Sequence, residues 1–121
     1  MSKLILVVED QEDNRRIFRD LLTSVGYVVI EAVNGLEGVS AAETHNPDLI
    51  LMDVQLPGID GYEATRRIKA NPSLQKIPII VVTSYALSGD DVKAFEAGCD
   101  AYVAKPFSPR VLLAQAQKYL S

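Results

Sequence analysis

The sequence predicts an α/β domain in which helices cover both faces of a parallel sheet. Short apolar runs alternate with stretches of helical spacing five times within 121 residues. Three of these runs are continuously apolar, which is typical of parallel strands buried on both faces. Right-handed crossovers between such strands place helices on both sides of the sheet. The length suits one domain, which we expect to span residues 1–121.

Five apolar runs are the expected strands. They are short and separated by more polar sequence, as strands of a small domain are. The runs are Leu4–Val8, Val28–Ile30, Leu49–Met52, Ile79–Val82 and Ala101–Ala104.

Each run is followed by a predicted helix. Gly26 and Gly98 suit helix ends, Asp60 suits a helix N-cap, and Pro47 marks a boundary. The segments that carry apolar residues at helical spacing are Ile17–Phe18–Leu21–Leu22–Val25, Leu36–Val39–Ala42, Tyr62 to Ala70, Asp90 to Ala97, and Leu112–Ala116–Leu120.

Composition excludes several classes of function. The net charge is −4 and the isoelectric point about 4.9, which argues against a nucleic-acid partner and against docking to an anionic membrane. No apolar run approaches the length of a membrane span. Cys99 is the sole cysteine, so no internal disulfide can form, and we expect a reducing cytoplasmic location.

Polar residues follow four of the five predicted strands. They are Glu9 and Asp10, then Asp53, then Thr83 and Ser84, and finally Lys105. In open α/β sheets, ligands bind outside the carboxyl ends of the strands. Three carboxylates, a hydroxyl and an ammonium group should therefore meet at one edge, although each residue alone would read as a cap or turn.

This set of side chains favours one kind of chemistry. Clustered carboxylates need a compensating charge, and Mg²⁺ prefers oxygen ligands. A lysine and a hydroxyl beside such a metal suit a phosphate group. No histidine or cysteine lies near these positions, which disfavours zinc, and no base is available to activate Thr83 or Ser84.

Five stretches of the sequence together match the motifs of one family. They are Val8–Asp10, Asp48–Asp53, Leu56–Gly61, Val82–Thr83 and Ala104–Phe107. Over nearly its whole length, the chain thus resembles the receiver domain of two-component response regulators. The resemblance implies a flavodoxin-like, three-layer (βα)5 fold with strand order 2-1-3-4-5.

The same resemblance assigns roles to individual residues. Asp53 would be the phosphoacceptor, and Lys105, with a cis bond to Pro106, would pair with the phosphoryl oxygens. Mg²⁺ or Mn²⁺ would bind the carboxylates of Asp10 and Asp53, the backbone carbonyl of Gln55 and, through water, Glu9. Thr83 and the backbone of Ser84 would contact the phosphoryl group. Tyr102 would be the aromatic residue whose side chain turns inward when Thr83 moves toward the phosphoryl group.

The resemblance also implies partners. These are a sensor histidine kinase or histidine phosphotransfer protein as donor and a downstream effector, with dimerisation on phosphorylation left open. The expected readout surface lies on the fourth helix, fifth strand and fifth helix, and the surface residues expected near it are Leu87, Val92, Tyr102 and Leu112. The chain is most similar to single-domain regulators of cell-cycle phosphorelays, and its start and end suggest a stand-alone protein.

Three alternatives remain. A Mg²⁺-dependent phosphatase would use Asp53 as nucleophile, but it would need an acid where Gln55 stands. A flavin-binding module would have an anionic cofactor beside Glu9 and Asp10, which repel it. A degenerate receiver would switch without phosphate, which the full set of acidic, Thr83 and Lys105 positions argues against.

Overall fold

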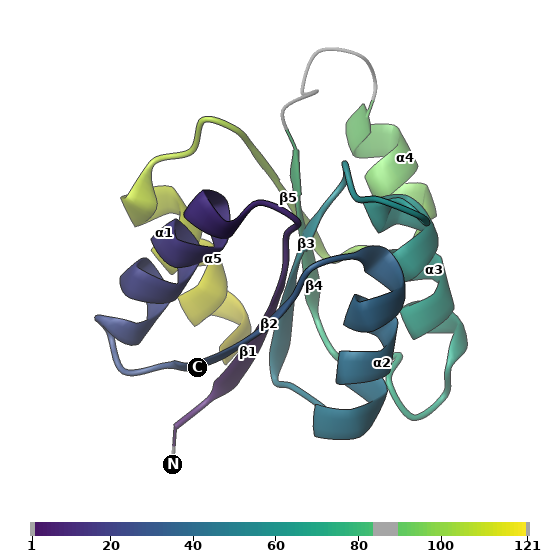
Figure 1. Cartoon of the computed structure of the whole chain (residues 1–121), viewed down its shortest axis with the longest axis horizontal. Coiled ribbons are helices and arrows are strands. Elements are labelled where there is room, and N and C mark those ends of the chain that lie inside the picture. The colour runs from purple at the N-terminus through teal and green to yellow at the C-terminus, as the bar shows by residue number, and fades with distance from the viewer. Residues whose placement is uncertain (1, 84–89, 121) are drawn as a thin grey trace.

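The computed structural model describes residues 2–83 and 90–120 and confirms the predicted α/β fold (Figure 1). Within these ranges, the strands form one parallel sheet in the order β2-β1-β3-β4-β5. None of the helices there is long and apolar enough to cross a membrane. The elements are β1 (Leu4–Val8), α1 (Glu12–Thr23), β2 (Val28–Ala32), α2 (Gly35–His45), β3 (Leu49–Asp53), α3 (Gly61–Ala70), β4 (Ile79–Thr83), α4 (Asp90–Glu96), β5 (Ala101–Ala104) and α5 (Pro109–Leu120).

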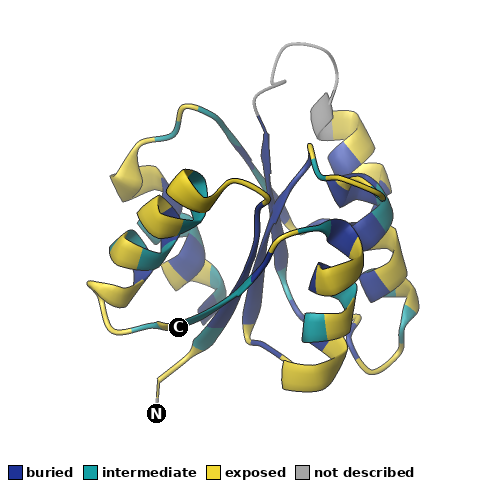
Figure 2. Ribbon diagram, in the orientation of Figure 1, coloured by how far each residue is buried: buried dark blue, intermediate teal, exposed yellow. Residues whose placement is uncertain are grey.

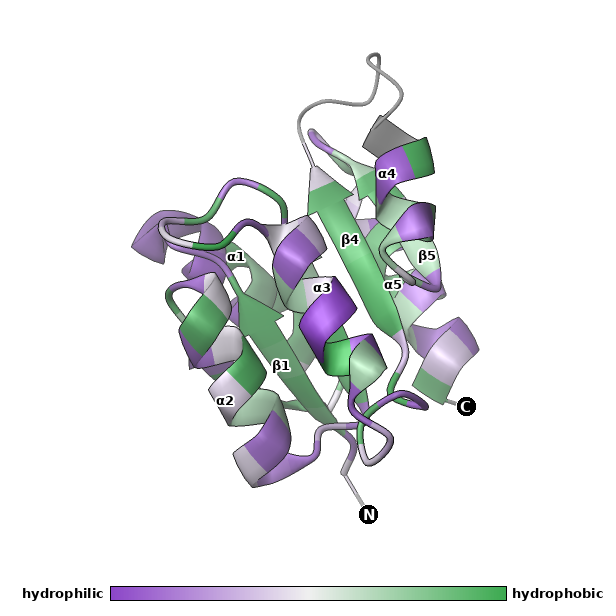
Figure 3. Ribbon diagram, turned by 90° about the vertical axis from the view of Figure 1, so that its right-hand side faces the viewer, coloured by the Kyte–Doolittle hydropathy of each residue, from purple (hydrophilic) through white to green (hydrophobic). Residues whose placement is uncertain are grey.

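The central strands are apolar throughout because both of their faces are covered. In β1, Ile5 and Val7 pack toward α1 and α5, whereas Leu6 and Val8 pack toward α2, α3 and α4. Side chains alternate across a strand, so each face needs its own apolar set. Figure 1 shows the two helical layers, Figure 2 the buried sheet between them, and Figure 3 the hydrophobic strands beneath α3.

Local capping explains where two of the helices begin. The side chain of Asn34 accepts a hydrogen bond from the backbone N–H of Glu37, and that of Asp60 accepts one from Glu63, both at 2.8 Å. These bonds satisfy N–H groups that have no partner inside the helix. The cap that the sequence predicted at Asp60 is confirmed, and it fixes the start of α3 close to the end of β3.

Three residues of the predicted apolar stripes do not face the core. Ile17, Val25 and Leu36 are 55%, 45% and 55% exposed. The buried face of α1 is formed by Phe18 and Leu22, four residues apart, so Ile17 lies on the flank. Val25 follows the end of α1, and in α2 the small residues Gly35, Gly38 and Ala42 are the ones buried.

Leu112 is also wrongly predicted, as a surface residue. It is fully buried because it begins the stripe of α5 that packs against the sheet, together with Ala116 and Leu120. Val92 is exposed as expected, at 55%. Leu87 lies outside the described residues.

Cys99 should be nearly inert as a nucleophile. Its side chain is buried, and burial, reinforced by the charge of Asp100, raises the pKa of the thiol to about 11. At pH 8, about one molecule in a thousand would carry the thiolate, which is the reactive form. Alkylation by iodoacetamide, followed by intact mass, should be slow for the folded protein and fast in urea. Rapid alkylation of the folded protein at pH 8 would contradict this.

Candidate functional site

Four strand ends bring the predicted residues to one edge of the sheet. Asp53 is the last residue of β3, and Thr83 is the last residue of β4. Glu9 follows β1, and Lys105 follows β5. In the register of the sheet, Asp53 lies opposite Val82, and Thr83 lies opposite Ala104. The convergence expected from the sequence is therefore present.

Three carboxylates form the centre of this edge. One oxygen each from Glu9, Asp10 and Asp53 lies within 4.8 Å of the other two. Glu9 and Asp53 are 1% and 8% exposed, whereas Asp10 is exposed. Like charges this close repel one another strongly where water is excluded. The arrangement therefore calls for positive charge nearby.

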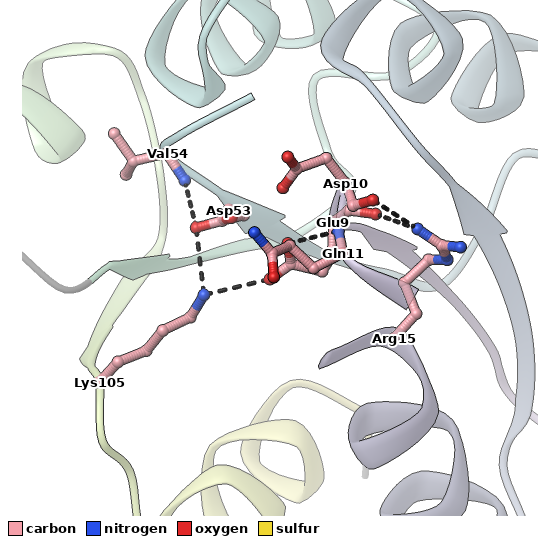
Figure 4. A network of polar contacts seen from close by, with 7 residues as sticks. All are labelled: Glu9, Asp10, Gln11, Arg15, Asp53, Val54 and Lys105. Carbon is pink, nitrogen blue, oxygen red and sulfur yellow. Dashed lines mark hydrogen bonds and ion pairs between the residues drawn. The ribbon is translucent and has the colours of Figure 1, made fainter. Parts of the chain in front are cut away.

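Lys105 supplies part of that charge (Figure 4). Its Nζ lies 3.1 Å from Oε1 of Glu9 and 3.4 Å from Oδ1 of Asp53. The backbone N–H of Lys105 donates to the carbonyl of Thr83 at 2.7 Å, which ties the loop to the end of β4. The peptide bond between Lys105 and Pro106 is cis, as the resemblance implied.

The two oxygens of Asp53 have different surroundings. Oδ1 accepts a hydrogen bond from the backbone N–H of Val54 at 2.9 Å and also contacts Lys105. Oδ2 accepts no hydrogen bond from any residue in the described part of the chain. Contacts from Val54 and Lys105 thus hold Oδ1 in place.

Crowding also changes the acidity of Asp10. Its pKa is raised above the usual range, first by partial burial and then by the hydrogen bond and negative charge of Glu9. The raised pKa means that these surroundings stabilise the charged form of Asp10 less well than water would. A bound cation would reverse that effect.

The donor set fits a hard divalent cation. All three candidate groups offer carboxylate oxygens, which Mg²⁺ prefers. Both oxygens of Glu9 already have partners, Oε1 with Lys105 and Oε2 with the backbone N–H of Gln11 at 3.1 Å. Asp10 and Asp53 are therefore better placed than Glu9 for direct contact with a metal.

A polar cavity of about 300 Å³ opens over these groups. It is lined by the charged side chains and by three amide side chains: Glu9, Asp10, Asp53 and Lys105, with Gln11, Asn14 and Gln55. The cavity is large enough for a metal ion with waters and a phosphoryl group. A larger hollow, of about 400 Å³, lies elsewhere, against α4, β5 and α5.

The remaining predicted residues differ in how far the structure describes them. Thr83 is 1% exposed, and Tyr102 is partly buried against the core beneath α2, α3 and α4. Gln55 is exposed at the cavity. Ser84 lies outside the described residues. Arg15, which donates to the backbone carbonyls of Glu9 and Asp10, could not be identified from the sequence, because its position depends on an ion pair with Glu31 of β2 that no local motif reveals.

Comparison with known proteins places this geometry in a family. A model of the response regulator receiver domain matches residues 5–117. The polar-differentiation response regulator DivK of Brucella anthropi is 43% identical over 120 residues, covering 99% of this chain and 98% of that protein. DivK of Brucella ovis is 42% identical, and the match again covers 99% of this chain and 98% of that protein.

Solved structures agree with this assignment. The receiver domain of the sensor histidine kinase PA1611 from Pseudomonas aeruginosa, with a magnesium ion in its active site cleft, is 39% identical with a TM-score of 0.93. The match covers 99% of this chain and 98% of that one. The chemotaxis protein CheY4 of Vibrio cholerae is 25% identical with a TM-score of 0.91, covering 98% and 99%. The chain belongs to the receiver domains of response regulators, which act in phosphorelay signalling.

Proposed function

We propose that this chain accepts a phosphoryl group on Asp53 and thereby switches a protein-interaction surface. The observation that carries the proposal is the position of Asp53, whose carboxylate lies beside Lys105 and within 4.8 Å of the other two acidic oxygens. A phosphatase acting on outside substrates is less well supported, because Gln55 cannot supply the acid.

Mg²⁺ or Mn²⁺ would bind the carboxylates of Asp10 and Asp53, the backbone carbonyl of Gln55 and, through water, Glu9. The engagement of both Glu9 oxygens supports the indirect role of that residue. When bound, the cation would neutralise the acidic cluster and the charge on the phosphoryl oxygens. The PA1611 receiver domain, with magnesium in its cleft, supports this choice of metal.

The phosphoryl transfer needs little covalent chemistry from the protein. An oxygen of Asp53 forms a bond to phosphorus while the phosphorus–nitrogen bond of a phosphohistidine donor breaks, and the electron pair of that bond goes to the imidazole. The N–H of Val54 and Lys105 hold Oδ1 of Asp53, which orients the carboxylate for in-line attack. Lys105 then pairs with the phosphoryl oxygens, and Thr83 and the backbone of Ser84 contact them.

Phosphorylation adds roughly one to two negative charges at the edge of the sheet. Thr83 and Lys105 gain a new partner, and Tyr102 follows Thr83 inward. The hollow against α4, β5 and α5, which Tyr102 lines with Phe95, Gln115 and Lys118, would change shape. A local charge event would thus bias a two-state surface.

The partners follow from this chemistry. A sensor histidine kinase or histidine phosphotransfer protein supplies the phosphoryl group, and an effector protein reads the changed surface. The single, buried cysteine is consistent with a reducing cytoplasm.

Incubation with acetyl phosphate and Mg²⁺ tests the proposal. Intact mass should rise by one phosphoryl group, and Asp53→Asn should abolish the gain because the amide is not a nucleophile. Asp20→Asn is the matched control, since Asp20 is exposed on α1 and away from the site.

The control should gain the same mass as the parent protein. Removal of Mg²⁺ with EDTA should prevent the gain in both. A parent protein that gains no mass, or an Asp53→Asn variant that gains it, would refute Asp53 as the phosphoacceptor.

A further inference from the structure

Arg15 of α1 lies behind the acidic turn that follows β1. Its Nη1 donates to the carbonyl oxygen of Glu9 at 2.9 Å and to that of Asp10 at 3.0 Å. Figure 4 shows Arg15 and Lys105 on opposite sides of the acidic group. One guanidinium therefore holds the backbone of two of the three residues whose carboxylates form the acidic cluster.

Arg15 is itself fixed by a residue of β2. Its Nε lies 3.3 Å from Oε1 of Glu31, and Arg19 holds the other oxygen of Glu31 at 2.9 Å. The side chain of Arg15 is 14% exposed and that of Glu31 26% exposed. A guanidinium donates in several fixed directions, so it can bind a carboxylate and backbone carbonyls at once. The contacts connect α1, β2 and the turn after β1.

We infer that Arg15 is a positioning residue for the divalent cation, an inference that rests on the proposed function. Three acidic oxygens within 4.8 Å repel one another, and a short turn yields to such repulsion by opening. Bonds from Arg15 to two consecutive carbonyls restrict the rotation of the peptide units of Glu9 and Asp10. The carboxylates are then held in a geometry suited to a cation before the cation binds. Residues that contact metal ligands from behind commonly have this effect.

The sign of the mutational effect separates this role from simple electrostatics. Arg15 is positively charged, so by charge alone its removal would make Mg²⁺ bind more tightly. Positioning predicts the opposite. Arg15→Gln and Arg15→Lys should each weaken Mg²⁺ binding about tenfold, the lower end of the effect of such supporting residues. Lysine keeps the charge but lacks the several donor directions that bind Glu31 and both carbonyls together.

The measurement is the Mg²⁺ dissociation constant of the unphosphorylated protein by titration calorimetry. Arg16→Gln is the matched control, because it removes the same charge from the neighbouring exposed position of α1. It should bind Mg²⁺ as tightly as the parent or slightly more tightly. Glu31→Gln should weaken binding less than Arg15→Gln, and the two effects should not add, because both act through one guanidinium.

Phosphorylation by acetyl phosphate gives a second readout. Arg15 variants should need more Mg²⁺ for the half-maximal rate, yet reach the parental rate when Mg²⁺ saturates. Circular dichroism verifies that each variant is folded. If Arg15→Gln does not fold, the Mg²⁺ affinity of Arg15→Lys tests the positioning role.

The outcomes separate the two proposals. A parent protein that binds no Mg²⁺ would overturn the proposed function and the inference with it. A parent that binds Mg²⁺, with folded Arg15 variants that bind it equally or more tightly, would overturn the inference alone.

Discussion

Replacing Gly61 with alanine should lower the free energy of unfolding by about 3 kcal/mol. Gly61 is the buried first residue of α3. A Cβ at this position would overlap the carbonyl oxygen of Asp53 and lie 2.8 Å from its carbonyl carbon. Alanine favours a helix over glycine by about 1 kcal/mol, but a clash with the backbone costs more because no flexible side chain can move aside. The steric effect should therefore dominate.

The control is Gly26→Ala, and urea denaturation is the measurement. Gly26 has a φ of +97°, and a methyl group added there would meet no atom within 4 Å, so alanine costs only conformational strain, about 1 kcal/mol. Gly61→Ala should be clearly the less stable of the two. Equal free energies of unfolding for the two variants would show that α3 can move away from β3 without an energetic cost.

The same substitution should affect phosphorylation. The N–H of Gly61 donates to the carbonyl of Val54 at 2.9 Å, so α3 and the end of β3 move together. Val54 in turn orients Oδ1 of Asp53. The close approach of α3 to this strand end is thus part of what holds the carboxylate of Asp53.

Much of the fold could be predicted because its signals are local. Continuous apolar runs mark strands that are covered on both faces, and each run ends at a polar residue that the structure places at the same edge of the sheet. The strand order could not be derived from the pattern and came from the family resemblance. The structure confirms it.

The errors concern which way a helix faces. Ile17 and Phe18 are adjacent and both apolar, yet only Phe18 is buried, at 3% exposure, and it stacks on Phe107 from the loop before α5. That choice depends on a residue distant in sequence. Arg15 was missed for the same reason, because its role needs Glu31 of β2. Contacts of this kind arise only when separate elements pack together.

Replacing Lys105 with methionine should slow phosphorylation of Asp53 about 100-fold at saturating Mg²⁺. Methionine has similar length without the charge. Nζ of Lys105 lies 3.4 Å from Oδ1 of Asp53, where it can stabilise negative charge on the incoming phosphoryl group. The measurement is the rate of mass gain with acetyl phosphate. Lys76→Met is the matched control, because Lys76 is exposed in the loop before β4, at the opposite edge of the sheet from the site.

Mg²⁺ binding should respond in the opposite direction. Lys105 competes with the cation for the charge of Asp53 and Glu9, so its loss should leave Mg²⁺ affinity unchanged or higher. Lys105→Met would then lower the saturating rate without weakening metal binding, whereas the Arg15 variants would weaken metal binding without lowering the saturating rate. A Lys105→Met variant phosphorylated at the parental rate would contradict a role in transfer. The two cations that flank the acidic group would thus serve separate steps, Arg15 in preparing the metal site and Lys105 in stabilising the transferred group.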